Sequence, residues 1–237
     1  MILIKRLLGQ VRKALKDFNM IQSGDKICVG VSGGKDSLTL LTLLAHTRRF
    51  YPEKFEIEAV TLTMGLDDAD LTPVVEYCKE IGVNYTIKET QIAQIVFEVR
   101  NEENPCSLCA NMRRGALHAI AKELGCNKIA LGHHRDDVLE TFMMSTFYEG
   151  RVHTFSPVTY LDRMNLHLIR PMIYIEENDI RRFVKEHPLH PVPKTCRIDG
   201  HTNRQYFKDL LHEMELKSPD LKNVLFGAIK RAGINGW

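Results

Sequence analysis

Apolar residues recur along this chain with two different spacings. Residues 2–18 carry them at helical spacing, which predicts an amphipathic helix. Residues 27–31 form a short continuous apolar run, which is typical of a strand buried on both faces. Short strands then alternate with longer helical segments through residue 148. The further predicted strands cover 55–64, 83–88 and 128–131, and the further predicted helices cover 38–44, 71–82, 107–125, 137–148, 176–186 and 203–231.

This alternation predicts an α/β fold in which helices cover both faces of a parallel sheet. We expect a basic helix in residues 1–24, a ligand-binding domain in 25–190 and a C-terminal helical segment in 191–237. Parallel sheets bind their ligands beyond the carboxyl ends of the strands. The residues that directly follow predicted strands are therefore the first candidates for chemistry.

Composition narrows the class of protein. Of the 237 residues, 44% are hydrophobic and 26% are charged, and no apolar run approaches the roughly 18 residues of a membrane span. The first residues do not resemble a signal peptide, so we expect a cytoplasmic protein without a membrane partner. The net charge is only +2, so a nucleic acid would need a local basic patch. The basic helix in 2–18 could form such a patch or could simply face solvent.

A glycine turn follows the first predicted strand and leads into a helix. A strand, a glycine turn and a helix N-terminus together form an anion site, because free backbone N–H groups point at the ligand and glycine lets phosphate approach closely. The lysine adds a mobile positive charge, and the two serines add hydroxyl groups. The turn consists of Ser32, Gly33, Gly34, Lys35, Asp36 and Ser37.

A second polar cluster follows the predicted strand at 128–131, so it lies at the same edge of the sheet. It begins with Gly132 and His133 and contains the adjacent carboxylates Asp136 and Asp137. One carboxylate is enough to cap a helix, and two adjacent ones repel unless a cation lies between them. A magnesium ion that accompanies pyrophosphate would supply that cation.

Three of the six cysteines are candidates for metal binding. Cys106 and Cys109 form a C-x-x-C pair at the start of a predicted helix, where the thiolate form is favoured. Cys196 lies in a proline-rich loop without apolar periodicity. The remaining cysteines occupy apolar segments and are predicted to be core residues. They are Cys28, Cys78 and Cys126.

These motifs resemble a known family. Residues 32–37, after a hydrophobic strand, resemble the signature of the PP-loop ATP pyrophosphatases, which split ATP between the α and β phosphates and leave AMP on a substrate oxygen. Residues 132–141 resemble that family's second signature, Gly-His-x-x-Asp-Asp-x-x-Glu-Thr. Residues 17–37 look like the corresponding stretch of the tRNA 2-thiocytidine synthetase group. That group has a C-x-x-C pair and one later cysteine, which Cys106, Cys109 and Cys196 match one for one.

The resemblance implies ATP-dependent 2-thiolation of tRNA. The enzyme would adenylate the C2 oxygen of a pyrimidine, cytidine in this group, and replace it with sulfur through a [4Fe–4S] cluster held by the three cysteines. ATP, Mg²⁺, tRNA and a sulfur donor, either a cysteine desulfurase or free sulfide, are implied with it. Residues 32–37, Gly132 and His133 would bind the nucleotide. The implied catalytic candidates are Lys35, Asp36, Asp136, Asp137 and Arg113, the last of which stands where some thiouridine-forming relatives carry a catalytic lysine.

Other interpretations of the residues stay open. A fourth ligand such as His190 or His201 would turn the three thiolates into a structural zinc site in another PP-loop adenylating enzyme. A non-enzymatic iron–sulfur sensor or RNA-binding module is a third hypothesis, against which the intact Lys35 and the two adjacent aspartates argue. Uridine as the modified base and a homodimer as the assembly are both compatible with the sequence.

Overall fold

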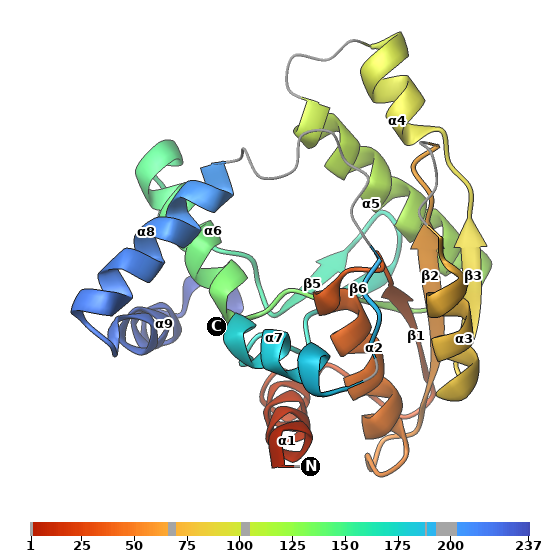
Figure 1. Ribbon diagram of the computed structural model, residues 1–237, viewed down its shortest axis with the longest axis horizontal. Coiled ribbons are helices and arrows are strands. Elements are labelled where there is room, and N and C mark those ends of the chain that lie inside the picture. Colours follow the sequence, from red (N-terminus) through yellow and green to blue (C-terminus); the bar gives the residue numbers. More distant parts are fainter. Residues whose placement is uncertain (1, 66–69, 101–104, 188, 193–202) are drawn as a thin grey trace.

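The computed structural model describes residues 2–65, 70–100, 105–187, 189–192 and 203–237. Within these residues, one six-stranded sheet has the strand order β3-β2-β1-β4-β6-β5 (Figure 1). All neighbouring strands are parallel except β5, which pairs antiparallel with β6 at one edge. The α/β fold predicted from the sequence is thereby confirmed. The strands are β1 Asp25–Gly30, β2 Phe55–Leu62, β3 Asn84–Lys88, β4 Lys128–Ala130, β5 Val158–Leu161 and β6 Leu166–Ile169.

Helices cover both faces of this sheet. One face packs against α1, α2, α3 and α7 through the largest apolar cluster, and the other face packs against α5. A third apolar cluster joins α6, α8 and α9 beside the sheet (Figure 1). The bounds of the helices are α1 Ile2–Asp17, α2 Lys35–Arg48, α3 Thr72–Glu80, α4 Ile92–Gln94, α5 Pro105–Glu123, α6 Arg135–Glu149, α7 Glu177–Glu186, α8 Asn203–Lys217 and α9 Leu221–Arg231, with a π-helical turn at Ile95–Val99 and a 3-10 turn at Ile234–Gly236.

The N-terminal helix belongs to the main core. Leu7, Val11 and Leu15 on α1 are fully buried in the cluster that also contains α2 and α7. The basic face is partly occupied as well, because Arg6 forms an ion pair with Asp179 on α7. The structure thus joins α1 closely to the sheet, and the division of the chain at residues 24 and 190 stays a prediction.

The structure differs from the sequence prediction at several stretches, among them the helical turns over residues 92–99. The hairpin of β5 and β6 was not expected, because four-residue strands are too short to show a period in the sequence. The helix expected over 203–231 is interrupted between α8 and α9, where Pro219 lies. Proline has no backbone N–H to continue a helix and disfavours helical geometry at the residue before it. Among the described helices, none is long and apolar enough to cross a membrane.

Candidate active site

The glycine turn lies between the carboxyl end of β1 and the first residue of α2. Gly33 has a φ of +76°, a conformation that side chains other than glycine rarely adopt. Its carbonyl accepts a hydrogen bond from the Val192 backbone at 3.0 Å, and a Cβ atom on Gly33 would lie 3.1 Å from the Val192 Cβ. The turn therefore needs glycine both for its backbone angle and for the close approach of the segment before residue 193.

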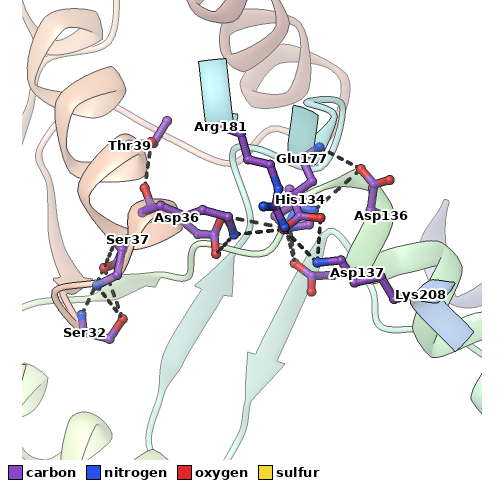
Figure 2. A network of polar contacts seen from close by, with 12 residues as sticks. Ser32, Asp36, Ser37, Thr39, His134, Asp136, Asp137, Glu177, Arg181 and Lys208 are labelled. Carbon is purple, nitrogen blue, oxygen red and sulfur yellow. Dashed lines mark hydrogen bonds and ion pairs between the residues drawn. The ribbon is translucent and has the colours of Figure 1, made fainter. Parts of the chain in front are cut away.

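The two serines of the turn hold its shape. The Ser37 hydroxyl accepts the Ser32 N–H at 3.1 Å and donates to the Gly34 carbonyl at 3.0 Å. Ser37 is buried, and the two hydroxyl groups lie 3.2 Å apart (Figure 2). These contacts fix the turn before any ligand binds, so little ordering is left for phosphate binding to impose.

Lys35 and Asp36 are the first two residues of α2. The Lys35 ammonium lies 2.9 Å from both oxygens of Asp36 and 3.1 Å from Oε1 of Glu177, the first residue of α7. Burial alone would lower the pKa of Lys35, but the two carboxylates outweigh it and raise that pKa. Lys35 therefore carries a full positive charge beside the glycine turn.

The second polar cluster meets the glycine turn through a glycine. A Cβ atom on Gly132 would lie 3.2 Å from the backbone carbon of Asp36 and 3.3 Å from the Ser37 nitrogen. Only glycine lets the chain after β4 pass so close to the first turn of α2. The two motifs, about 100 residues apart in sequence, thus share one edge of the sheet, as the parallel topology predicts.

The two adjacent aspartates have different surroundings. Asp136 is buried, accepts the Glu177 backbone N–H at 2.8 Å and pairs with Lys222 of α9 at 3.1 Å. Burial would raise the pKa of Asp136, but these donors outweigh it and lower that pKa. Asp137 is more accessible, accepts the His134 N–H at 2.9 Å and pairs with Arg204 at 3.1 Å. Asp136 thus joins α6 to α7 and α9, whereas Asp137 joins α6 to α8 and lies 3.4 Å from His134 Nε2.

The two adjacent histidines also diverge. His134 is buried, with Nε2 at 3.8 Å from Asp36 and 3.4 Å from Asp137 (Figure 2). Its Nδ1 is buried and has no hydrogen-bond partner among the described residues. His133 instead stacks on Phe155 and accepts a hydrogen bond from Arg170 at 3.3 Å. Burial lowers the pKa of His133 to about 4, so this ring is neutral. The sequence prediction named His133 for nucleotide binding and omitted His134, although both lie in the same motif.

The C-terminal helices complete the polar network. Arg204 on α8 lies 3.3 Å from Glu140 on α6, and Lys208 lies 2.7 Å from Glu177 on α7. Burial raises the pKa of Glu140 to about 7, and nearby Asp137 adds to this shift. Arg204 and Lys208 thus pair with carboxylates of the site.

The cysteine pair lies on a different element. Cys106 and Cys109 are three residues apart in the first turn of α5, so they share one face of the helix. Cys106 is exposed and Cys109 is half-buried. Cys196 lies outside the described residues, and within those residues no group of three His, Cys, Asp or Glu side chains is placed to hold a metal ion. Two accessible thiols at a helix start are a donor set that fits iron–sulfur or zinc chemistry, provided that a further ligand joins them.

The other cysteines are core residues, as predicted. Cys28, Cys78 and Cys126 are all buried. The thiols of Cys28 and Cys126 are hydrogen-bonded to each other, and this bond together with burial raises the pKa of Cys28. Burial also raises the pKa of Cys78 to about 11. A raised pKa disfavours the thiolate form that binds metal, so Cys28 and Cys78 are poor metal ligands.

Comparison with known proteins agrees with this geometry. The PP-loop domain family matches residues 6–206. The chain belongs to the PP-loop family. A tRNA-cytidine(32) 2-sulfurtransferase from Syntrophotalea carbinolica is 39% identical over 229 residues, which cover 95% of this chain and 87% of that protein. The protein of the same name from Pseudomonas aeruginosa PAO1 is 40% identical over 229 residues, which cover 95% of this chain and 83% of that protein.

Two solved structures share the fold. The U34-tRNA thiolase NcsA from Methanococcus maripaludis, solved with its [4Fe–4S] cluster, is 25% identical and superposes with a TM-score of 0.79 over 97% of this chain and 78% of its own. An NH3-dependent NAD synthetase from Campylobacter jejuni is 15% identical, with a TM-score of 0.52 over 97% of this chain and 91% of its own. The second likeness concerns the fold alone.

Within this PP-loop fold, most of the predicted site residues that the structure describes fall into two groups, whereas His133 and Asp136 contact other partners. Residues 32–37, Gly132 and Asp137 lie together at the carboxyl edge of the sheet. Cys106, Cys109 and the exposed Arg113 share α5 and form a separate group. The site residues that the sequence prediction missed are His134, Glu140 and Glu177. His134 and Glu140 could have been found from the second signature, whereas Glu177 is marked only by its position at the start of a helix.

Proposed function

We propose that this chain is an ATP-dependent tRNA sulfurtransferase that replaces the C2 oxygen of a cytidine with sulfur. The observation that carries the proposal is the meeting of Lys35 and Asp36 with His134 and Asp137 at one sheet edge, on an α/β fold whose α5 presents a thiol pair. Relatives that are 39–40% identical over nearly the whole chain bear the name tRNA-cytidine(32) 2-sulfurtransferase, which supports cytidine as the target.

The first half of the reaction uses the glycine turn. Backbone N–H groups of 32–37 and the Lys35 ammonium would hold the ATP phosphates, since fixed dipoles and a charged donor stabilise the transferring phosphoryl group. Asp36 and Asp137 would place the Mg²⁺ that accompanies ATP, because Mg²⁺ binds through one or two carboxylates together with phosphate oxygens. The cytidine C2 oxygen then attacks the α-phosphate, which yields an adenylated base and pyrophosphate.

In the second half, a sulfur nucleophile attacks C2 and AMP departs with the original oxygen. Cys106, Cys109 and Cys196 would hold a [4Fe–4S] cluster, which when bound supplies an iron with an open position for the incoming sulfur. Cys196 follows Val192, which contacts Gly33, by only four residues. The sulfur would come from a cysteine desulfurase or from free sulfide, and the reaction would take place in the cytoplasm.

Nucleoside analysis tests this function. The protein is reconstituted anaerobically with iron and sulfide and then incubated with Mg²⁺, ATP, free sulfide as the sulfur donor, and tRNA that lacks 2-thiocytidine. We expect 2-thiocytidine by mass spectrometry, with one AMP formed per thiolated base. Cys196→Ala should abolish thiolation, whereas Cys78→Ala, which removes a buried core thiol, should retain it.

Each contrary outcome identifies a different error. Thiolation that persists in Cys196→Ala removes the cluster role. AMP formation without sulfur incorporation, together with bound zinc, indicates another PP-loop adenylating enzyme. Formation of 2-thiouridine instead of 2-thiocytidine overturns the assignment of the base.

A further inference from the structure

The carboxylate of Glu177 is shared by three cations from three different elements. Glu177 is the first residue of α7, and its side chain is 9% exposed. Its carboxylate lies 3.1 Å from Lys35 of α2. It also lies 2.9 Å from Arg181 of its own helix and 2.7 Å from Lys208 of α8 (Figure 2). A single buried group therefore links the phosphate-binding lysine to the C-terminal helix.

The backbone of Glu177 is held in place as firmly as its side chain. Its N–H donates to Asp136 at 2.8 Å, and the Arg135 backbone donates to Ile175 at 2.9 Å, so the starts of α6 and α7 are joined. Glu176 extends this junction with an ion pair to Arg135 at 3.1 Å. Glu177 is therefore a fixed point relative to the second signature.

A carboxylate at the start of a helix has an ordinary explanation, since it interacts favourably with the helix dipole. The neighbouring acidic residues fit that explanation with partners outside the glycine turn: Glu176 contacts Arg135, and Asp179 contacts Arg6. Glu177 differs because its carboxylate contacts Lys35. Although burial would raise the pKa of Glu177, Lys208 and Lys35 outweigh it and lower that pKa to about 2, so the group stays charged at any physiological pH.

We propose that Glu177 is a positioning residue for Lys35, and that Lys208 sets how strongly Glu177 retains it. This inference rests on the proposed binding of ATP at the glycine turn. With the site empty, Glu177 and Asp36 hold the flexible lysine side chain over the turn. When phosphate draws Lys35 away, Lys208 and Arg181 continue to neutralise the buried Glu177, which would otherwise be left as an unpaired charge.

Removal of the Lys208 charge and removal of the Glu177 charge should affect ATP binding differently. Without the Lys208 charge, Glu177 has one cationic partner fewer and attracts Lys35 more strongly. Lys35 is then less available to the phosphates, so ATP binds more weakly. Removal of the Glu177 charge frees Lys35 and takes a negative charge away from the phosphate site, so ATP binding does not weaken. Turnover should still fall in that second variant, because an unguided lysine must be ordered in each cycle.

Calorimetry with ATP and Mg²⁺, without tRNA or sulfide, tests the binding part in the full chain. We expect Lys208→Gln to raise the Kd for ATP about fivefold, at the lower end of typical coupling between sites. Glu177→Gln should leave that Kd unchanged or lower it, and the double variant should match Glu177→Gln within about twofold. Matched controls are Lys217→Gln on the same helix α8, which pairs with the exposed Glu213, and Glu176→Gln, which removes the adjacent charge.

The results separate this inference from the function on which it rests. A wild-type protein that does not bind ATP overturns both. With ATP bound by the wild type, equal Kd values for Lys208→Gln and Lys217→Gln overturn the inference alone. The same weakening by Lys208→Gln in the Glu177→Gln background also overturns it, because Lys208 then acts without Glu177.

A double-mutant cycle on turnover distinguishes positioning from simple support of the fold. Glu177→Gln should reduce AMP formation about tenfold, which corresponds to the cost of ordering one long side chain. In a Lys35→Gln background the same substitution should cause no further loss, since the group that it positions is gone. Additive losses in the two backgrounds, with a lowered melting temperature, mean that Glu177 only stabilises the structure and overturn the proposal.

Discussion

The two halves of the proposed chemistry are built in different ways. At the glycine turn, charged side chains from α2, α6, α7 and α8 form a continuous network in which the Glu177 and Glu140 side chains are 9% and 4% exposed. At the start of α5, Cys106 is exposed, and the described residues bring no third metal ligand to the pair. The protein itself arranges the charged residues around the glycine turn, which we call the assembled end. Cys106 and Cys109 form the cysteine end, whose sulfur ligands a metal cofactor must bring together.

This difference follows from what each end has to do. Stabilising charge on a phosphoryl group requires dipoles and cations that are fixed before the substrate arrives, so that they need no rearrangement during reaction. Thiolate ligands gain their order from the metal that they bind, since a preformed site is costly to maintain without it. The comparison therefore predicts that substitutions at the two ends fail separately and in different assays.

We expect the largest effects from one substitution at each end, with each variant measured in the assays for both ends. Cys106→Ala should lower thiolation more than about 100-fold, because loss of a ligand removes the metal site, while the Kd for ATP stays unchanged. Asp137→Asn should lower AMP formation by a similar factor, because the carboxylate proposed to place Mg²⁺ is lost, while iron content stays unchanged. Iron analysis, ATP calorimetry and nucleoside mass spectrometry check the pair.

Ser107→Ala, on the same exposed turn of α5, is the control for the cysteine end. Loss of ATP binding in Cys106→Ala, or loss of iron in Asp137→Asn, would show that the two ends form one cooperative site, which contradicts the comparison.

Replacing a glycine by alanine should have opposite effects on stability at the two ends, because the packing around the two glycines differs. Gly132→Ala places a Cβ atom 3.2 Å from the Asp36 backbone. We therefore expect the free energy of unfolding to fall by about 1–3 kcal/mol and the Kd for ATP to rise about tenfold. Gly115→Ala on α5 meets nothing within 4 Å and should raise stability by about 0.5–1 kcal/mol, because alanine favours helix more than glycine does. Denaturant titration and ATP calorimetry measure both effects, and an equal response of the two variants would remove the contrast.

The assembled end was partly predictable from the sequence. Because the glycine turn and the second signature both follow parallel strands, their meeting at one sheet edge was expected, and the structure brings Gly132 against Asp36. The buried state of Cys28, Cys78 and Cys126 was also expected from their apolar surroundings.

The counter-charges of that end were not predictable. Lys208 and Glu177 are 31 residues apart, and Arg204 and Asp137 are 67 residues apart. Such pairs have no period or spacing in sequence, since only the packing of α8 on α6 brings them together. Exposed charge on a helix and charge turned toward a site therefore look the same in the sequence.

A buried carboxylate of the assembled end should make stability depend on pH. The pKa of Glu140 is about 7 in the folded protein and 4.5 as an ordinary value, so the folded state binds the proton more tightly. Its contribution is fully present below pH 4.5 and is lost as pH rises through 7. In the wild type, this group should lower the free energy of unfolding by about 2–3 kcal/mol between pH 5 and pH 8. The Glu140→Gln variant should lack that decrease.

Denaturant titrations at several pH values measure this slope, and Glu149→Gln on the same helix is the control because that side chain is 49% exposed. A Glu140→Gln variant that keeps the wild-type slope would mean that Arg204, which lies 3.3 Å away, already keeps Glu140 ionised.

The smallest effect is expected at Arg113, one turn after Cys109 on the exposed start of α5. Arginine stays protonated at all working pH values, so Arg113 can supply charge but cannot act as a base. Arg113→Lys keeps that charge and should change the thiolation rate by less than about threefold, whereas Arg113→Ala should lower it about tenfold. If Arg113→Lys instead gives a rate that rises with pH through the lysine titration, proton transfer at this position is limiting, and the cysteine end contributes acid–base chemistry of its own in addition to metal ligands.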